Sequence, residues 1–517
     1  MNIVSAYVIT FIASFCILVI EIVAGRILAP FVGVSLYTWT SIIGVVLAGI
    51  SIGAYLGGRL ADRFPGKKTL GWLLLVSGIT TLLISPLTNL VAGYQFPTSL
   101  MLRILIVTAI TFFIPSCILG MISPVVVKLV IRNLQEVGNI VGKIYAISTL
   151  GSIVGTFAAG FFLISWMGTR HIILVMGCIL ILTAVFWGSL FRTKKPAVGF
   201  LLLPSLLIWG TYDLAFKPPL TADTYYYKES DYYTLKLKKT LSKDGKTKLE
   251  ALILDNLVHS YVDLGDPLHI EYQYEKIYAE VLKWKFKKED AFSALTIGGG
   301  GYTFPRYMEA FYPDSFLSVV EIDPEITGIA RRYLGLSDRT RIRTFNTDGR
   351  WFVMNCREKY DVIFIDAYND LSIPYHLTTT EFAGQIRNIL NRGGILLTNI
   401  IDNFRKGSFL PSYIRTLRKV FGENNVHLIS ISPYFEKIGT STFIVLAGRD
   451  DLNIRDFQSY LSSRTDNEKT SAVVPEDLVN RFIAKTYSVV LRDDYAPVDN
   501  LIAPVFEERF GYNRKLR

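Results

Sequence analysis

Apolar residues are distributed in two different ways along the chain. Up to about residue 215 they form six stretches long enough to cross a bilayer as helices, at 3–24, 37–60, 69–93, 100–127, 139–165 and 170–191. A seventh, weaker stretch, Phe200–Leu214, contains Pro204. Beyond Thr221 the apolar runs shorten to strand length. The pattern predicts a multi-pass α-helical membrane domain of six to seven segments over residues 1–215, followed by a second half of different construction.

The second half alternates between strand and helix periodicities. Its first part predicts a small β region over 221–265 with a polar turn at 242–246. From Ala294 strands and helices follow one another, which is typical of a mostly parallel sheet covered by helices on both faces. We therefore expect an α/β Rossmann-like domain over 266–517. The runs include Tyr225–Leu237 and Ala251–Leu264 as strands, His269–Phe286 as a helix, and Val426–Ser432 with Thr442–Ala447 as a late hairpin.

Composition and charge fit a membrane protein better than a nucleic-acid-binding one. Half of the residues are hydrophobic, only 19% are charged, and the mean hydropathy is +0.35. The net charge is +10, but no nucleic-acid motif accompanies it. The positive-inside rule places basic loops in the cytoplasm, and with them the amino terminus. These basic residues follow the second, fourth and sixth stretches: Arg59, Arg63, Lys67, Lys68, Lys128, Arg132, Arg192, Lys194 and Lys195.

The four cysteines form neither a disulfide framework nor a zinc spacing. Cys16, Cys117 and Cys178 lie in apolar stretches, and Cys356 stands alone in the second half. This usage fits a reducing compartment, and we expect no metal. The first apolar stretch has no basic region before it and no small-residue cleavage site after it, so we expect a retained helix rather than a signal peptide.

The side of the membrane on which the second half lies depends on Phe200–Leu214. If this stretch spans, the second half lies outside the cytoplasm; if it is re-entrant or interfacial, the second half is cytoplasmic. Its fifteen or so residues are short for a span, and nucleoside cofactors are intracellular. We therefore expect a multi-pass protein of the cell (inner) membrane whose soluble part is cytoplasmic. Glu21 is either a functional group at membrane depth or one half of an interfacial pair with Arg26.

The strongest chemical signal is a glycine turn after an apolar strand. Leu295–Ile297 leads into Gly298, Gly299, Gly300 and Gly301, and a second strand ends in Glu321 roughly twenty residues later. Asp348, Gly349 and Asp366 follow later strands. In a parallel sheet these groups meet at the carboxyl edge, where ligands bind. The third glycine of a dinucleotide motif is missing, which favours a ligand without phosphates, such as an S-adenosyl sulfonium compound.

Taken in order, these motifs resemble those of spermidine synthases over residues 225–450. The resemblance includes Leu254-Asp255, Glu271-x-x-Tyr274, the glycine turn, Val320–Asp323, Asp348-Gly349 and Tyr360–Asp366. Segments 21–33, 142–155, 366–381 and 492–500 look like the membrane-fused branch of this polyamine aminopropyltransferase family, which has the class I S-adenosylmethionine-dependent transferase fold.

The resemblance implies a membrane-bound transferase that moves an aminopropyl group from decarboxylated S-adenosylmethionine to an amine such as putrescine. Glu321 would bind the ribose, Asp348 the adenine, and Asp366 would be the base. The partners implied are membrane lipid and a small amine, with the oligomeric state, a homo-oligomer included, left open. The glycines and Gly349 would line the cofactor site. Asp370, Glu271, Tyr274 and Tyr368 would line the amine site.

Two departures from the family pattern leave alternatives open. Gly301 stands where an acidic residue normally grips the donor amine, and Tyr302 follows where glycine is usual. Asn369 stands where a second aspartate is usual, with Asp370 beside it. An S-adenosylmethionine-dependent methyltransferase or a related alkyl transferase would tolerate the loss at Gly301. A membrane transporter or sensor with a non-catalytic ligand-binding domain is the third hypothesis. His376 is the histidine that we expect nearest the site.

Overall fold

The chain folds into two compact units. The structure is a computed structural model, and it describes all residues except 93, 95–97, 132–133, 190–220, 222, 256, 369–372, 436–438, 465–470 and 511–517. One unit comprises Met1–Ala222 with Tyr227–Thr234, and the other comprises Asp223–Tyr226 with Leu235–Arg517. We call them the helical unit and the α/β unit.

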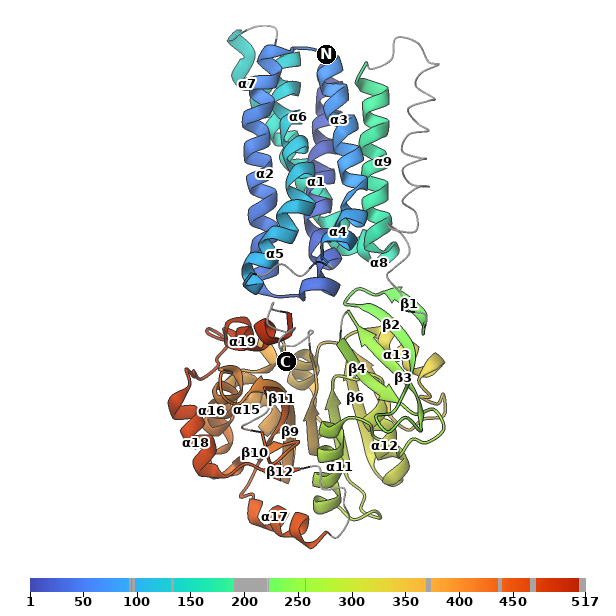
Figure 1. The fold of residues 1–517 in the computed structure, drawn as a ribbon, viewed down its shortest axis with the longest axis vertical. Coiled ribbons are helices and arrows are strands. Elements are labelled where there is room, and N and C mark those ends of the chain that lie inside the picture. Colours follow the sequence, from blue (N-terminus) through green and yellow to red (C-terminus); the bar gives the residue numbers. More distant parts are fainter. Residues whose placement is uncertain are drawn as a thin grey trace. The chain divides into compact units, whose positions relative to one another are not determined.

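All six predicted apolar stretches are helical (Figure 1). Five helical segments are long and apolar enough to cross a membrane, or six if the bent pair of α3 and α4 counts as one, by length and composition alone and within the described residues. The predicted seventh stretch, Phe200–Leu214, lies outside the described residues. The helices are α1 (Ile3–Val32), α2 (Leu36–Arg63), α3 (Lys67–Leu82), α4 (Ile84–Ala92), α5 (Leu100–Thr108), α6 (Ile114–Val130), α7 (Val137–Ala158), α8 (Ile164–Trp166) and α9 (Thr169–Trp187), with π-helical turns η1 (Ala109–Phe113) and η3 (Ala159–Leu163) and a short 3-10 turn η2 (Leu134–Glu136).

Small residues let these helices approach in pairs. A Cβ atom added at Gly53 of α2 would lie 2.0 Å from the carbonyl oxygen of Cys117 in α6. One added at Gly151 of α7 would lie 2.5 Å from the carbonyl oxygen of Phe11 in α1. Contacts this close between backbones require glycine, and they are typical of helix packing in lipid.

The two ends of the helical unit are marked by different contacts. At one end the Met1 amino group donates to the Leu129 carbonyl oxygen at 3.3 Å, and Lys128 pairs with Asp62. At the other end Arg26, which the sequence suggested as a partner of Glu21, donates to the backbone carbonyl oxygens of Ser230, at 2.5 Å, and Asp231.

A four-stranded antiparallel sheet follows, in the order β1-β2-β3-β4. Each predicted strand is divided in two by a turn, because Ser230 bonds to Tyr233 and Asp255 has a positive φ of 51°. The predicted polar turn at 242–246 joins β2 to β3. The strands are β1 (Thr224–Glu229), β2 (Thr234–Leu241), β3 (Lys248–Leu254) and β4 (Leu257–Val262).

The α/β unit is built on an eight-stranded sheet with the order β12-β10-β11-β9-β8-β5-β6-β7. Strands β5 to β9 are parallel, and β10 and β11 form the predicted antiparallel hairpin. The strand order reverses between β5 and β8, which is where such sheets bind ligands. This confirms the Rossmann-like, class I transferase-type fold. The strands are β5 (Ser293–Ile297), β6 (Phe316–Glu321), β7 (Arg343–Asn346), β8 (Tyr360–Ile365), β9 (Leu390–Asn403), β10 (Val426–Ser430), β11 (Thr440–Gly448) and β12 (Ala472–Val473).

Helices cover both faces of this sheet. On one face Tyr278 of α11 (Gln273–Lys285) packs on Phe364 of β8, with ring centroids 4.8 Å apart. The next residue, Ile365, points to the opposite face and is in register with Thr398 of β9. On that face Tyr413 of α16 (Phe409–Phe421) bonds to Thr398. The other helices are α12 (Thr303–Phe311), α13 (Pro324–Tyr333), α14 (Gly349–Asn355), α15 (Thr380–Ile389), α17 (Ile454–Ser463), α18 (Glu476–Lys485) and α19 (Val498–Phe510), with 3-10 turns η4 (Tyr375–Leu377) and η5 (Glu423–Asn425).

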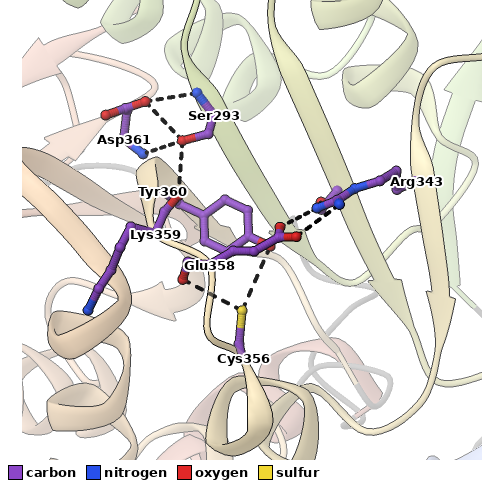
Figure 2. Close-up of polar contacts among 8 residues, drawn as sticks. Ser293, Arg343, Cys356, Glu358, Lys359, Tyr360 and Asp361 are labelled. Carbon is purple, nitrogen blue, oxygen red and sulfur yellow. Dashed lines mark hydrogen bonds and ion pairs between the residues drawn. The ribbon is translucent and has the colours of Figure 1, made fainter.

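The amino ends of the central strands are tied together by polar contacts. Figure 2 shows Ser293 and Asp361 exchanging bonds, with the Ser293 amide 2.8 Å from Asp361 Oδ2. Arg343 pairs with Glu358, and Cys356 lies beside Tyr360, at 3.9 Å. These bonds fix the frame at the edge opposite the predicted site.

Candidate active site

The glycine turn brings the carboxyl ends of three strands together. Gly298, with φ +99°, donates to the Val320 carbonyl oxygen at 2.8 Å, and the Asp366 amide donates to the Ile297 carbonyl oxygen at 2.9 Å. A Cβ atom at Gly298 would lie 2.2 Å from the carbonyl oxygen of Asp366. Only glycine fits here, so the turn places Asp366 beside the predicted nucleoside pocket.

Glu321 lies at the end of β6 and faces the glycine turn. Its Oε2 accepts from the Gly299 amide at 2.7 Å, and its Oε1 accepts from the Asp323 amide at 2.9 Å. Only 5% of the residue is exposed, and burial raises the pKa of the carboxyl to about 7 against the lowering effect of these amides. A buried carboxylate held by backbone amides has free lone pairs for ligand hydroxyl groups.

Asp348 caps α14 and Gly349 is its first residue, shortly after the end of β7. Asp348 Oδ1 caps the helix by accepting from the Trp351 amide, and Oδ2 lies 2.9 Å from His376 Nε2. Burial acts to raise the pKa of Asp348, but these bonds lower it overall. A Cβ at Gly349 would lie 2.6 Å from Ile297 Cγ2, so glycine is needed for this close approach to β5. His376 thus reaches one of the predicted site residues.

Two further charged residues hold the loop that carries His376. Arg350 donates to Asp493 through Nη1 and Nη2, at 2.7 and 2.5 Å. Its Nη1 also donates to the His376 carbonyl oxygen. Thr379 also donates to Asp493, at 2.7 Å. The 492–500 segment, which the sequence linked to the membrane-fused branch, therefore anchors the loop after β8.

Asp366 is held by two side chains from different elements. Tyr274 donates its hydroxyl to Oδ2 and Asn399 donates its amide to Oδ1, each at 2.9 Å. Burial raises the pKa of Asp366, and the two bonds oppose this shift. The structure thus brings Tyr274 to Asp366, and it adds Asn399, which the sequence analysis did not name and which directly follows the part of β9 that pairs with β8.

The other predicted amine-site residues are placed differently from one another. Tyr368 donates to the Asn399 carbonyl oxygen at 2.6 Å and accepts from the Ile401 amide, so it supports β9 beside Asp366. Glu271 accepts from the Lys243 amide at 2.9 Å and lies 3.2 Å from His269. Asp370 lies outside the described residues.

A buried carboxyl that the sequence analysis missed lies near Asp366. Glu275 follows Tyr274 on α11, is 5% exposed, and has no partner for its Oε2 among the described residues. Burial and the charge of Asp366 raise its pKa well above the usual range. Its position next to the Tyr274 motif was the signal that could have found it.

The departure at Gly301 has a structural cause. The Gly301 amide donates to Ser260 Oγ at 2.7 Å, and a Cβ atom at this position would lie 2.6 Å from Ser260 Cβ. Strand β4 therefore fills the space that an acidic side chain would need. Tyr302 adopts a positive φ of 58°, and its buried hydroxyl bonds to Thr327 at 2.9 Å. No group of three or more His, Cys, Asp or Glu residues within the described part of the chain could hold a metal ion.

Part of the α/β unit is similar to known proteins. Residues 276–451 match the model of the spermine/spermidine synthase domain. A probable polyamine aminopropyl transferase of Bifidobacterium longum is 31% identical over 226 residues, 41% of this chain and 49% of that protein. Polyamine aminopropyltransferase 2 of Aquifex aeolicus is 23% identical over 466 residues, 87% of this chain and 88% of that protein.

The structure of a probable spermidine synthase from Corynebacterium glutamicum is 19% identical, covers 52% of this chain and 96% of that one, and gives a TM-score of 0.43. The chain spans about half the length of the relatives from Bifidobacterium longum and Vibrio vulnificus, 49% and 43%. The region that matches the spermine/spermidine synthase domain contains the glycine turn, Glu321, Asp348 and Asp366.

Proposed function

We propose that the α/β unit transfers an aminopropyl group from decarboxylated S-adenosylmethionine to an amine such as putrescine. The observation that supports this most is the setting of Asp366, held between Tyr274 and Asn399 beside the glycine turn and Glu321. A carboxylate that is fixed at a nucleoside pocket and raised in pKa by burial suits a base for an amine.

The reaction is an in-line displacement. Asp366 takes a proton from the acceptor ammonium and orients the free amine. The nitrogen lone pair attacks the propyl carbon beside the sulfonium, the C–S bond breaks, and its electron pair stays on sulfur to give methylthioadenosine. Glu321 accepts the ribose hydroxyls and the glycine turn leaves room for the nucleoside. The step depends on positioning and one base.

A methyl or other alkyl transfer from S-adenosylmethionine is the second candidate. The observation that favours it is the space at Gly301, which Ser260 fills, so that no acidic side chain can grip a donor amine there. A methyl donor has no such requirement.

The nucleoside product distinguishes the candidates. The purified full chain is incubated in detergent with each donor and a panel of amines. Methylthioadenosine supports aminopropyl transfer, S-adenosylhomocysteine supports methyl transfer, and no turnover leaves a transporter or sensor. Asp366→Asn should abolish turnover and retain donor binding. Asp361→Asn is the matched control, because Asp361 lies at the opposite end of the same strand, bonded to Ser293.

For the helical unit we propose insertion into the cell membrane. Its long apolar helices and glycine contacts support this, and so does the position of the basic residues. The Met1 amino group bonds to Leu129, beside Lys128, and the end of α9 reaches the same end, since a Cβ at Gly188 would lie 2.4 Å from Gly71 Cα near the start of α3. Of the basic residues in the described part of the chain, Lys128 near the end of α6 and those at the start of α3 thus lie at the end that carries the amino terminus.

The chain enters the β-strands at the other end of the helical unit. Arg26 lies 24 residues after Asn2, about 36 Å along α1, and bonds to Ser230. Glu229 accepts from the Thr169 amide at the start of α9, at 2.7 Å. Tyr227–Thr234 belongs to the helical unit, and these contacts place it at the end opposite the amino terminus.

These contacts bear on the side of the membrane, for which the sequence led us to expect the cytoplasm. Because the basic residues favour a cytoplasmic amino terminus and Tyr227–Thr234 lies at the opposite end of the helical unit, we propose the outer side for the α/β unit as the alternative to be tested. Its donor must then be available there.

Cys356 gives a direct test, because the other three cysteines lie in the helical unit. An impermeant maleimide added to intact cells should label wild type but not Cys356→Ser. Labelling of Cys356 only after the cells are opened would contradict this orientation.

A further inference from the structure

Three polar groups around Asp366 have unused hydrogen-bonding capacity. Glu275 Oε2, Tyr278 Oη and Asn399 Oδ1 have no partner among the described residues, although their residues are only 5%, 2% and 4% exposed. Buried polar atoms normally have partners, so such a cluster indicates a place for a bound molecule. Another buried acid of α11, Glu280, differs because Ser471 donates to it and Arg464 pairs with it.

These groups share one site. Asn399 bonds directly to Asp366 through its amide nitrogen, which directs its carbonyl oxygen to another donor. Tyr278 packs on Phe364, which lies two residues before Asp366 near the end of β8. Glu275 follows Tyr274, whose hydroxyl bonds to Asp366. The charge of Asp366 acts on both Glu275 and Tyr278, which places them within electrostatic reach of it.

Two of the unused atoms, Glu275 Oε2 and Asn399 Oδ1, are acceptors, and Asp366 adds a second carboxyl group. A primary ammonium carries three N–H donors and a positive charge, so it satisfies acceptors and relieves the repulsion between two carboxylates at once. The position at which the family normally has an acid for an amine, Gly301, has no room for one because of Ser260. A carboxylate for the amine must therefore come from another element.

We propose that Glu275 is that carboxylate: together with Asp366, and with Asn399 Oδ1 as a further acceptor, it binds a primary ammonium group of the substrates. The proposal rests on the proposed function, because both an aminopropyl donor and a diamine acceptor carry such a group. Sequence alone did not indicate it, because Glu275 stands beside the recognised Tyr274 rather than in the glycine turn.

Binding of the cation should release a proton. Without a ligand, burial and Asp366 favour the protonated form of Glu275. An ammonium in contact with Glu275 favours the ionised form, so binding shifts the proton to the buffer. Calorimetric titration of the wild-type chain with 1,4-diaminobutane and with decarboxylated S-adenosylmethionine, in buffers of different ionisation enthalpy, measures this release. If neither titration releases a proton near pH 7, the proposal is overturned.

A variant tests the residue itself. Glu275→Gln keeps the volume and removes the charge, and Glu280→Gln is the control on the same helix. Loss of a bond to a charged group should weaken the affected ligand ten- to hundredfold. Weaker binding of decarboxylated S-adenosylmethionine but not of methylthioadenosine, which has no amine, assigns the site to the donor. Weaker binding of 1,4-diaminobutane assigns it to the acceptor.

Unchanged affinity for both amines in Glu275→Gln would refute the proposal, with thermal unfolding confirming that the variant is folded. Should that variant not fold, absence of proton release from the wild-type chain would still overturn the proposal. Failure of the proposed function looks different: no methylthioadenosine forms with any amine, whatever the binding results.

Discussion

Replacing Gly301 by alanine tests whether β4 excludes a side chain from the glycine turn. The new Cβ would lie 2.6 Å from Ser260 Cβ, 3.0 Å from Ser260 Oγ and 3.1 Å from Val262 Cγ2. Carbon atoms in contact prefer roughly 3.5–4.0 Å, so the turn and β4 must separate by about 1 Å. Overpacking of this kind destabilises a protein by about 1–3 kcal/mol. Gly301 has no positive φ, so backbone strain adds nothing to this figure.

The steric origin can be isolated with two variants of Ser260. Ser260→Gly removes both the Cβ and the hydroxyl. Of the three contacts, only that with Val262 Cγ2, at 3.1 Å, then remains. Ser260→Ala removes the hydroxyl bond to the Gly301 amide but keeps the Cβ. Gly301→Ala should therefore cost about 1–3 kcal/mol in the wild-type and Ser260→Ala backgrounds and at least about 1 kcal/mol less in Ser260→Gly.

The assay is the change in unfolding midpoint of the full chain in detergent, converted to free energy across the double-mutant cycle. Equal effects of Gly301→Ala in the Ser260→Ala and Ser260→Gly backgrounds would refute the steric reasoning. A wild-type-like Gly301→Ala variant would also show that an acidic residue is absent from this position for another reason.

Asp366→Asn should lower kcat by at least about a hundredfold, the usual contribution of a general base, while equilibrium binding of the donor stays near wild type; retained turnover would exclude Asp366 as the base. Asp402, fully buried, has its pKa raised to about 7 by burial. Because the folded state then holds a proton that the unfolded state has lost, stability should fall as pH rises from about 4 to 7; thermal scans should show a smaller fall in Asp402→Asn, and an identical pH dependence would contradict this. Arg350→Met should raise the protease sensitivity of the 492–500 segment, since it removes the paired bonds to Asp493; an unchanged digestion pattern would count against that anchor.

Much of the fold follows from periodicity because the relevant elements are long and regular. The alternation from Ala294 gave the parallel strands and the late hairpin, since both depend on local apolar patterns. The two β runs after Thr221 were each predicted as one strand, because a turn such as that at Asp255, with a positive φ in a non-glycine residue, has no strong local signal. The helices after Ile454 were missed, because their short amphipathic patterns follow no recognised motif.

Some site residues can be found from their position along the chain, and others only from contacts in the folded structure. Asp366, Glu321 and the glycine turn each end a strand, so their order along the chain predicts that they meet. Asn399 and Ser260 act on this site from β9 and β4, and only the folded chain reveals those contacts. Glu271 is likewise held by contacts that its spacing to Tyr274 does not indicate, with the Lys243 amide and with His269.

The departures from the family pattern at the glycine turn belong to one packing arrangement. Ser260 fills the space at Gly301 and accepts its amide bond. Tyr302, next in the chain, takes a left-handed backbone conformation, which costs a residue other than glycine roughly 1–2 kcal/mol of conformational free energy. Its ring lies against Gly299, at 3.0 Å from the position of a Cβ there, and its buried hydroxyl bonds to Thr327, which offsets that penalty. Because each of these residues fits only with the others, an acid introduced at 301 alone cannot restore the usual amine contact, and a binding carboxylate has to come from outside the turn.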